Sequence, residues 1–242
     1  MRKSIAAAVI AASAATGACG RMHHEDEGAT ASRNYQVGNF QEIESAGPYD
    51  VIVRTGANPS VSARGPEKLL ERAIVEVRGD KLVIHPQENH GFFNFDWGTH
   101  RRAVFTVTVP QLRAATMAGS GDLNIDSVKG DQFVGKLAGA GDLSIGSANV
   151  QSLKLALAGS GDAKVGTGQA QSAEYAIVGA GDIDATGVTT QQLKVSIAGS
   201  GDIKAHATGN ADVNIMGSGD VTVTGGAKCN ISKAGSGDVH CS

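Results

Sequence analysis

An aspartate at the end of a Gly-Ser/Ala-Gly-Asp tetrapeptide recurs through the second half of the chain. Successive copies are 20, 20, 20, 20, 18 and 18 residues apart. A carboxylate in such a glycine-rich corner can accept hydrogen bonds from the backbone N–H groups of a turn. It can also supply an oxygen ligand to a hard cation such as calcium. The candidates for this chemistry are Asp122, Asp142, Asp162, Asp182, Asp202, Asp220 and Asp238.

The regular spacing of these aspartates indicates stacked structural repeats. Within each repeat apolar and polar residues alternate, as in the apolar Leu153, Leu155 and Leu157 that precede one tetrapeptide. Strict alternation predicts strands with one buried face. Each repeat therefore forms one coil, and stacking the coils in register buries their apolar residues as columns. The sequence predicts an all-β fold, a parallel β-solenoid over residues 113–242 with seven Gly-Ser/Ala-Gly-Asp corners.

Stacking the coils would bring the corner aspartates into a column of like charges. At a strand spacing of about 4.8 Å, neighbouring carboxylates repel each other by roughly 1 kcal/mol in water. We expect backbone N–H groups of the corner to offset this repulsion in an Asx-type turn, without any cofactor. The alternative is bound calcium, although one carboxylate per coil is few for a cation that takes about six to eight oxygens. Its candidate ligands are Asp122, Asp142, Asp162, Asp182 and Asp202.

Four aromatic residues gather in the first half of the chain, in a segment flanked by histidines and arginines: Phe92, Phe93, Phe95 and Trp97. On a surface loop these rings would bind a partner protein or a glycan. The alternative interpretation is a cap in which the rings fold back over the core. The histidines are scattered, and the recurring aspartate belongs to every repeat. No residue is therefore predicted to be catalytic, and we expect no enzyme.

The beginning of the chain has the features of an export signal over residues 1–18: two cations, a short apolar stretch and then small residues. Cys19 directly follows small residues, as in the bacterial lipobox, so we expect it to be acylated and to anchor the protein to a membrane. Simple cleavage without a lipid is the alternative. The polar residues 19–34 predict a flexible tether. In an exported protein, Cys229 and Cys241 predict a disulfide.

Residues 35–112 break the repeat but keep the alternating strand pattern, and they contain all five prolines and eight of the ten aromatic residues. The first coil of a solenoid exposes strand edges that need covering. We therefore predict an irregular, aromatic-rich β region that caps the stack. A net charge of −3 argues against nucleic acid as a partner. The chain has no apolar run of about 18 residues, so no membrane-spanning helix is expected.

Several short segments occur in a characteristic order before the repeats: residues 40–43, 49–51, 67–70, 82–84 and 107–112. Together with the glycine-aspartate corners, this order resembles the bacterial head GIN domain family of autotransporter-type adhesins, whose activity is not defined. The resemblance covers residues 35–242. It implies a β-solenoid that is exported to the cell envelope, often as a lipoprotein, and it brings no catalytic residues.

We therefore expect a non-enzymatic, exported protein of the cell envelope, in the periplasm or at the outer membrane and cell surface. Its elongated surface would serve as an adhesin or scaffold for an envelope protein or a glycan. Two other functions stay open from the sequence. One is a calcium-stabilised structural stalk. The other is a polysaccharide-active enzyme of β-helix type, which would need acid and base groups clustered on one face.

Overall fold

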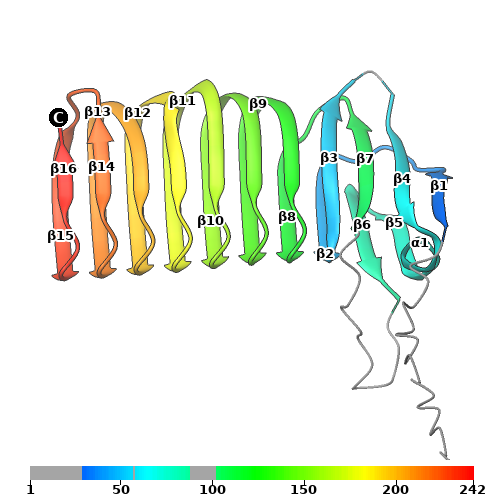
Figure 1. The fold of residues 1–242 in the computed structure, drawn as a ribbon. Helices are drawn as coiled ribbons and strands as arrows, with labels where there is room; N and C mark the ends of the chain where they lie inside the picture. The colour runs from blue at the N-terminus through cyan, green and yellow to red at the C-terminus, as the bar shows by residue number, and fades with distance from the viewer. Residues whose placement is uncertain (1–28, 57, 88–101) are drawn as a thin grey trace, which may run out of the picture.

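The computed structural model describes residues 29–56, 58–87 and 102–242. Within these ranges the chain forms a long stack of strands and one short helix, α1 (Glu67–Arg72). Figure 1 shows a row of coils that ends at the C-terminus, with the first strands gathered at the opposite end. The fold is a parallel β-solenoid, as the sequence predicts. No helix among the described residues is long and apolar enough to cross a membrane.

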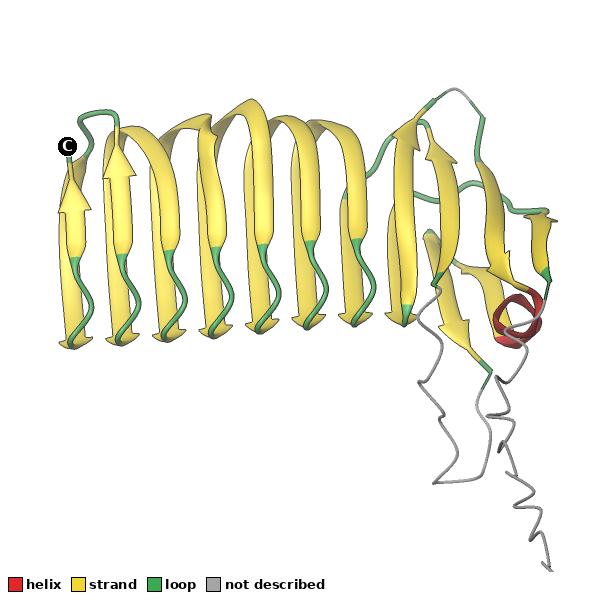
Figure 2. Cartoon of the chain, viewed as in Figure 1, coloured by secondary structure: helices red, strands yellow, loops and turns green. Residues whose placement is uncertain are grey.

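Five long strands each follow the path of one coil, and each pairs in parallel with the next. Leu143 lies opposite Ala163, and Leu155 lies opposite Tyr175, so the sequence period of 20 residues is the length of one coil. The corner tetrapeptides contain the short loops that recur at the same place in every coil (Figure 2). These strands are β9 (Leu123–Gly139), β10 (Leu143–Gly159), β11 (Ala163–Gly179), β12 (Ile183–Gly199) and β13 (Ile203–Gly217).

The C-terminal end of the stack is built from three shorter strands. They are β14 (Val221–Thr224), β15 (Lys228–Gly235) and β16 (Val239–Cys241). β14 pairs with the first half of β13, and β15 pairs with its second half. β16 then pairs in parallel with β14. The two sides of the coil therefore end in two different strands.

The interior of the stack consists of apolar columns to which each coil contributes one residue. Two aromatic side chains, Phe133 and Tyr175, are buried inside the coils. Each has a small residue two positions away in its own strand, Gly135 in one case and Ala173 in the other. The coil between them carries leucines at both positions. One such column is formed by the buried residues that directly follow the corner aspartates: Leu123, Leu143, Ala163, Ile183, Ile203 and Val221.

The stack begins earlier in the chain than the corner motif indicates. β2 (Glu42–Gly47) pairs in parallel with β8 (Ala114–Gly119), and β3 (Tyr49–Thr55) pairs in parallel with β9. Gly47 lies opposite Gly119, so the tetrapeptide at 47–50 forms a further corner beside the one at 119–122. Its sequence, Gly-Pro-Tyr-Asp, departs from the repeat. The strands of residues 42–55 are therefore part of the stack.

Between β3 and β8 the chain makes an excursion that builds the N-terminal end of the molecule. β7 (Ala103–Val109) adds to β3 in parallel, and β4 (Ser60–Pro66) adds to β7 in an antiparallel direction. On the other side, β6 (Lys81–Pro86) adds to β2, and β5 (Ala73–Arg78) adds to β6. One continuous series of strands thus runs along the molecule: β1-β4-β7-β3-β9-β10-β11-β12-β13-β14-β16.

The prediction of a flexible tether over residues 19–34 is wrong for its last part. β1 (Thr30–Tyr35) pairs in an antiparallel direction with β4. Its alternate residues turn inward, and the ring centroid of Tyr35 lies 6.2 Å from that of Phe105. The segment is polar because the other face of this edge strand stays exposed. Residues 19–28 lie outside the described residues.

Tyr175 offers a test of the packing inside the coils. Its side chain is buried, and among the described residues its hydroxyl has no hydrogen-bond partner. A buried group without a partner costs about 1–3 kcal/mol, so Tyr175→Phe should raise the free energy of unfolding measured in urea. Burial also raises the pKa of Tyr175. Because the pKa is higher in the folded state, the wild type should lose stability as the pH rises above about 10, and the variant should lose less.

Two further variants serve as controls for this measurement. Tyr175→Ala empties the same space and should cost about 3–5 kcal/mol. Met216→Ala changes a side chain that is 69% exposed, and it should alter stability by less than about 0.5 kcal/mol. A Tyr175→Phe variant that is less stable than the wild type at neutral pH would contradict this account.

Candidate functional site

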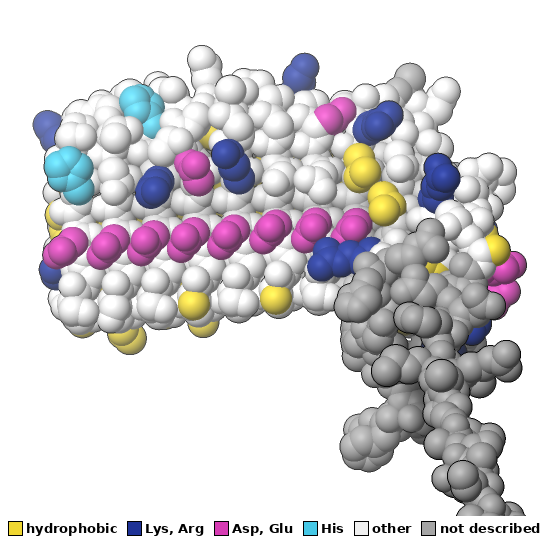
Figure 3. All heavy atoms as spheres, in the orientation of Figure 1, with side chains coloured by type: hydrophobic (Ala, Val, Ile, Leu, Met, Phe, Trp, Pro, Cys, Tyr) yellow, Lys and Arg dark blue, Asp and Glu magenta, His cyan; other side chains and the backbone are white. Residues whose placement is uncertain are grey.

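The corner aspartates form a continuous row along one edge of the stack, the magenta row in Figure 3. From one coil to the next, the backbone N–H of each aspartate donates a hydrogen bond to Oδ1 of the aspartate before it. The N···O distance is 3.1 Å between Asp162 and Asp142, and 2.8 Å between Asp202 and Asp182. In the other direction, the Leu143 N–H donates to the carbonyl oxygen of Asp162 at 2.8 Å. Each corner is thus tied to the next coil twice.

The structure adds one aspartate that the repeat does not contain. The Asp122 N–H donates to Oδ1 of Asp50 at 3.0 Å, although the two residues are 72 positions apart. In the sequence, the signal for this corner is a glycine three residues before an aspartate at the start of a strand pattern. We call the complete row the aspartate ladder: Asp50, Asp122, Asp142, Asp162, Asp182, Asp202, Asp220 and Asp238.

The hydrogen bonds of the ladder differ from the expected Asx-type turn. Backbone N–H groups do donate to the carboxylates, but within the repeats each donor belongs to the following coil, 18 or 20 residues later. The carboxylate therefore links two coils instead of closing its own turn. The expectation of an Asx-type turn is wrong in the identity of the donor, because a sequence period does not show which coil supplies it.

Basic side chains lie at both ends of the ladder. Arg102 Nη1 is 3.0 Å from Oδ1 of Asp50 and 3.3 Å from Oδ2 of Asp122. Its hydrogen bond to Asp50, together with the charges of both carboxylates, raises the pKa of Arg102. At the other end, Lys233 Nζ is 3.6 Å from Oδ1 of Asp238. These cations offset part of the repulsion between the carboxylates, although each exposed pair contributes only about 0–1 kcal/mol.

Two glycines in each corner allow the coils to approach closely enough for the ladder to form. Gly139 has a φ of +135°, and a Cβ there would collide with the carbonyl oxygen of Gly119. A Cβ on Gly141 would collide with the carbonyl oxygen of Gly121 in the same way. Both contacts are made with the preceding coil. In the corner at 47–50, Tyr49 stands at the position equivalent to Gly121, and its side chain is buried.

The calcium interpretation finds no multidentate site in the described part of the chain. No group of three or more His, Cys, Asp or Glu residues is placed there to hold a metal ion. Each ladder carboxylate up to Asp220 already accepts a backbone N–H at Oδ1. One remaining carboxylate oxygen per coil is far fewer than the roughly six to eight oxygen ligands that calcium takes. The candidate ligands Asp122, Asp142, Asp162, Asp182 and Asp202 thus serve as links between coils.

The other predicted site residues fall into two groups. Cys229 and Cys241 form a disulfide with a Cα–Cα distance of 6.6 Å, and it joins β15 to β16 across the last coil. Cys19 lies outside the described residues, so its acylation stays a prediction. The same holds for the aromatic segment of the predicted binding loop, Phe92, Phe93, Phe95 and Trp97.

A second row of side chains runs beside the ladder on the outward face of the strands. It takes one residue from each strand of the series β1 to β16, and the residues lie opposite one another in the pairing register. None of them is buried, and all except Ile52 are polar. We call this set the polar row: Asn34, Ser62, Thr106, Ile52, Asn124, Ser144, Lys164, Asp184, Lys204, Thr222 and His240.

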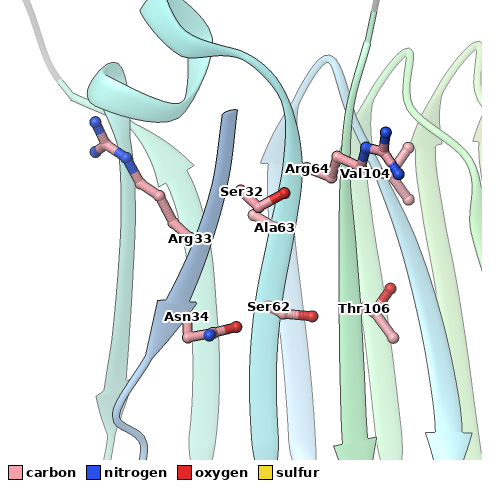
Figure 4. Close-up of a pocket in the computed structure, with 8 residues that line it drawn as sticks. All are labelled: Ser32, Arg33, Asn34, Ser62, Ala63, Arg64, Val104 and Thr106. Atoms are coloured by element: carbon pink, nitrogen blue, oxygen red, sulfur yellow. The ribbon is translucent and has the colours of Figure 1, made fainter. Parts of the chain in front are cut away.

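Two hollows lie along the polar row. The first, of about 540 Å³, lies on β1, β4 and β7, and Figure 4 shows its lining residues. The second, of about 250 Å³, lies between the polar row and the ladder and includes Lys164, Asp184 and Lys204. A hydrogen bond of 2.7 Å from Thr186 Oγ1 lowers the pKa of Asp184, and the two lysines act in the same direction. The polar row therefore carries fixed charges of both signs in its middle.

The ladder gives a test of hydrogen bonding against cation binding. Asp162→Asn keeps an acceptor oxygen and removes one charge, so it should leave the free energy of unfolding in urea unchanged or raise it slightly. Asp162→Ala removes the acceptor and should cost about 1 kcal/mol. Adding calcium or a chelator should not change the melting temperature of either variant or of the wild type.

The calcium interpretation makes the opposite prediction. It requires a chelator to lower the melting temperature of the wild type and requires Asp162→Asn to abolish that response. A chelator effect of this kind would contradict the account of the ladder. Equal destabilisation by the Asn and Ala variants would contradict it as well.

A comparison with protein families finds that the model described as "Putative auto-transporter adhesin, head GIN domain" matches residues 39–227. A comparison with curated proteins finds no match. The family match covers more than three quarters of the chain, from the residue before the buried Phe40 to the last coil.

Several solved structures have the same fold. A protein from Bacteroides fragilis NCTC 9343, named a putative adhesin, is 25% identical, with a TM-score of 0.75 over 88% of this chain and 97% of that chain. Two proteins from Parabacteroides distasonis ATCC 8503 are similar in fold alone. One, named a putative adhesin, has 22% identity and a TM-score of 0.69 over 89% and 98% of the two chains. The other, named a putative lipid binding protein, has 24% identity and a TM-score of 0.69 over 88% and 96%.

Proposed function

Because the chain belongs to the family described as "Putative auto-transporter adhesin, head GIN domain", we propose that it is a non-enzymatic binding protein of the cell envelope. Its ligand is an extended polymer that lies along the outward face of the strands from β1 to β16. The polar row is the observation that carries this proposal. Its ten intervals of about 4.8 Å give a line of hydrogen-bonding groups roughly 48 Å long.

The regularity of the face favours a repetitive ligand. Hydroxyl, amide and charged groups can all exchange hydrogen bonds with the hydroxyl groups of a polysaccharide. A polymer with repeating units can make a weak contact at each of several evenly spaced coils, and linked contacts of this kind raise the overall affinity without any single strong site. This is the behaviour that adhesion to a cell surface or matrix requires.

The chemistry of the ladder favours binding over hydrolysis. A glycoside hydrolase uses two carboxyl groups at one place, with an acid and a base in distinct environments. The ladder instead repeats one carboxylate with the same hydrogen bond in successive coils. A repeated structural link of this kind provides no local acid–base pair.

The proposal includes export through residues 1–18 and a lipid on Cys19, both of which rest on the sequence alone. A lipid anchor followed by a polar segment would hold the solenoid outside the membrane with its face free. The aromatic residues Phe92, Phe93, Phe95 and Trp97 would provide a second contact with the ligand or with an envelope protein.

The proposed binding face can be tested by replacing lysines on this face and, as a control, lysines on the other side of the same coils. Lys164→Ser with Lys204→Ser alters the polar row. Lys154→Ser with Lys194→Ser makes the same change on the second halves of the coils, in a separate hollow of about 300 Å³. On an array of bacterial and host polysaccharides, the first variant should lose about tenfold or more in affinity for the bound polymers. The second should stay within about twofold.

Circular dichroism of both variants controls for folding. The absence of any bound polysaccharide, or an equal loss from both variants, would contradict the proposed binding face.

A further inference from the structure

We propose that the hollow on β1, β4 and β7 binds the carboxylate of an acidic polysaccharide, with Arg64 as the contact for the anion. This inference rests on the proposed function, because the hollow is the N-terminal end of the polar row. It adds the chemical class of the ligand and the place where its charged group is held.

The hollow is formed by two adjacent rows of side chains across three strands. In one row, Asn34, Ser62 and Thr106 lie opposite one another on β1, β4 and β7. The next row places Arg64 between Ser32 of β1 and Val104 of β7. Figure 4 shows these short side chains around the hollow, with the guanidinium of Arg64 beside Val104. The volume of about 540 Å³ is sufficient for two or three sugar rings, since small-molecule sites commonly occupy about 300–1,000 Å³.

Of the two arginines that line the hollow, Arg64 is the one placed to bind a ligand. Its side chain is exposed, and among the described residues it has no ion-pair partner. Arg33, which also lines the hollow, donates to the carbonyl oxygen of Leu70 at 3.1 Å and lies 3.8 Å from Glu71. Figure 4 shows its guanidinium turned away from the other lining residues. An arginine can hold a carboxylate through two parallel hydrogen bonds, which is the strongest contact this set of residues offers.

The distribution of charge along the face directs an anion to this end. The residues that line the first hollow include two arginines and no acid. The second hollow is lined by four aspartates and two lysines. An acidic group is therefore attracted to Arg64 and repelled by the aspartate ladder. The ladder begins beside the hollow at Asp50, opposite Val104, but there Arg102 pairs with the carboxylate. Salt screens these interactions only in part, because an anion in the hollow lies within the Debye length of about 8–10 Å from the nearest charged side chains.

The remaining lining residues fit a sugar better than a lipid or a peptide. Serine, threonine and asparagine side chains both donate and accept hydrogen bonds, which matches the mixed character of sugar hydroxyls. Val104 is the one sizeable apolar side chain among the lining residues, so the hollow lacks the apolar depth that an acyl chain or a large hydrophobic side chain would need. The polar row continues from this hollow through Ile52 to Asn124, which extends the contact to neighbouring sugar units.

The test measures the binding of the full chain to three carboxylated polysaccharides: polygalacturonate, alginate and hyaluronate. Each is compared with its own carboxyl-reduced, neutral form. We expect at least one acidic polymer to bind about tenfold or more tightly than its reduced form. Arg64→Gln should remove this difference and leave the weaker binding of the reduced form unchanged.

Arg54→Gln is the matched control. Arg54 lies on β3, is exposed, does not line the hollow and has no ion-pair partner among the described residues. This variant removes the same charge near the same face and should keep the preference for the acidic polymer within about twofold. An equal loss from both variants would overturn the assignment to Arg64.

The remaining outcomes separate this inference from the proposed function. If neutral polysaccharides bind to the polar row but no acidic polymer is preferred, the inference fails and the proposed function stands. If polyglutamate competes as well as the acidic polysaccharide and depends on Arg64 in the same way, the ligand class is wrong. If no polysaccharide of either kind binds, both the inference and the proposed function fail.

Discussion

The structure depends on the parallel pairing of coils that lie 18 or 20 residues apart in the sequence. Backbone hydrogen bonds hold each coil against the next, and the aspartate ladder adds a side-chain hydrogen bond at one edge. The paired glycines make this possible, because a Cβ at either position would meet a carbonyl oxygen of the preceding coil. Since equivalent positions stack, each outward position of the coil becomes a row of side chains along the molecule. From Asn124 to His240, the polar row follows from that stacking.

The sequence predicts the regular coils well because the same constraint acts on every one of them. The repeat shortens from 20 to 18 residues, and the two residues are lost away from the corner, where the stacking of neighbouring coils is less strict. Register shifts between β12 and β13 lie near Thr189 and Thr190, while Ile183 and Leu193 keep their expected partners in β13. The part of the coil around Thr189 and Thr190 therefore changes length, and the aspartate ladder is not disturbed. The strands that begin after the corners stay in register at both coil lengths.

The first part of the molecule could not be predicted in the same way. Asp50 joins the ladder through a contact across 72 residues, and its corner contains Pro48 and Tyr49 in place of the usual small residues. The first hollow combines β1, β4 and β7, which are neighbours in the sheet although they are not consecutive in the chain. β1 and β4 pair in an antiparallel direction, so no period relates Asn34 to Ser62. The position of Arg64 beside these short polar side chains becomes visible only when the three strands are placed together.

Deleting one coil tests the stacking of equivalent positions most directly. Removal of residues 163–182 takes out one full coil of 20 residues and joins the corner that ends at Asp162 to the start of β12 at Ile183. The remaining coils stay in register, so the stack should form with one coil fewer. Removal of residues 163–172 takes out half a coil and places the following corner on the wrong side. Circular dichroism and urea unfolding should show a folded, cooperatively unfolding protein for the first deletion and loss of the native transition for the second. Equal behaviour of the two deletions would contradict the account.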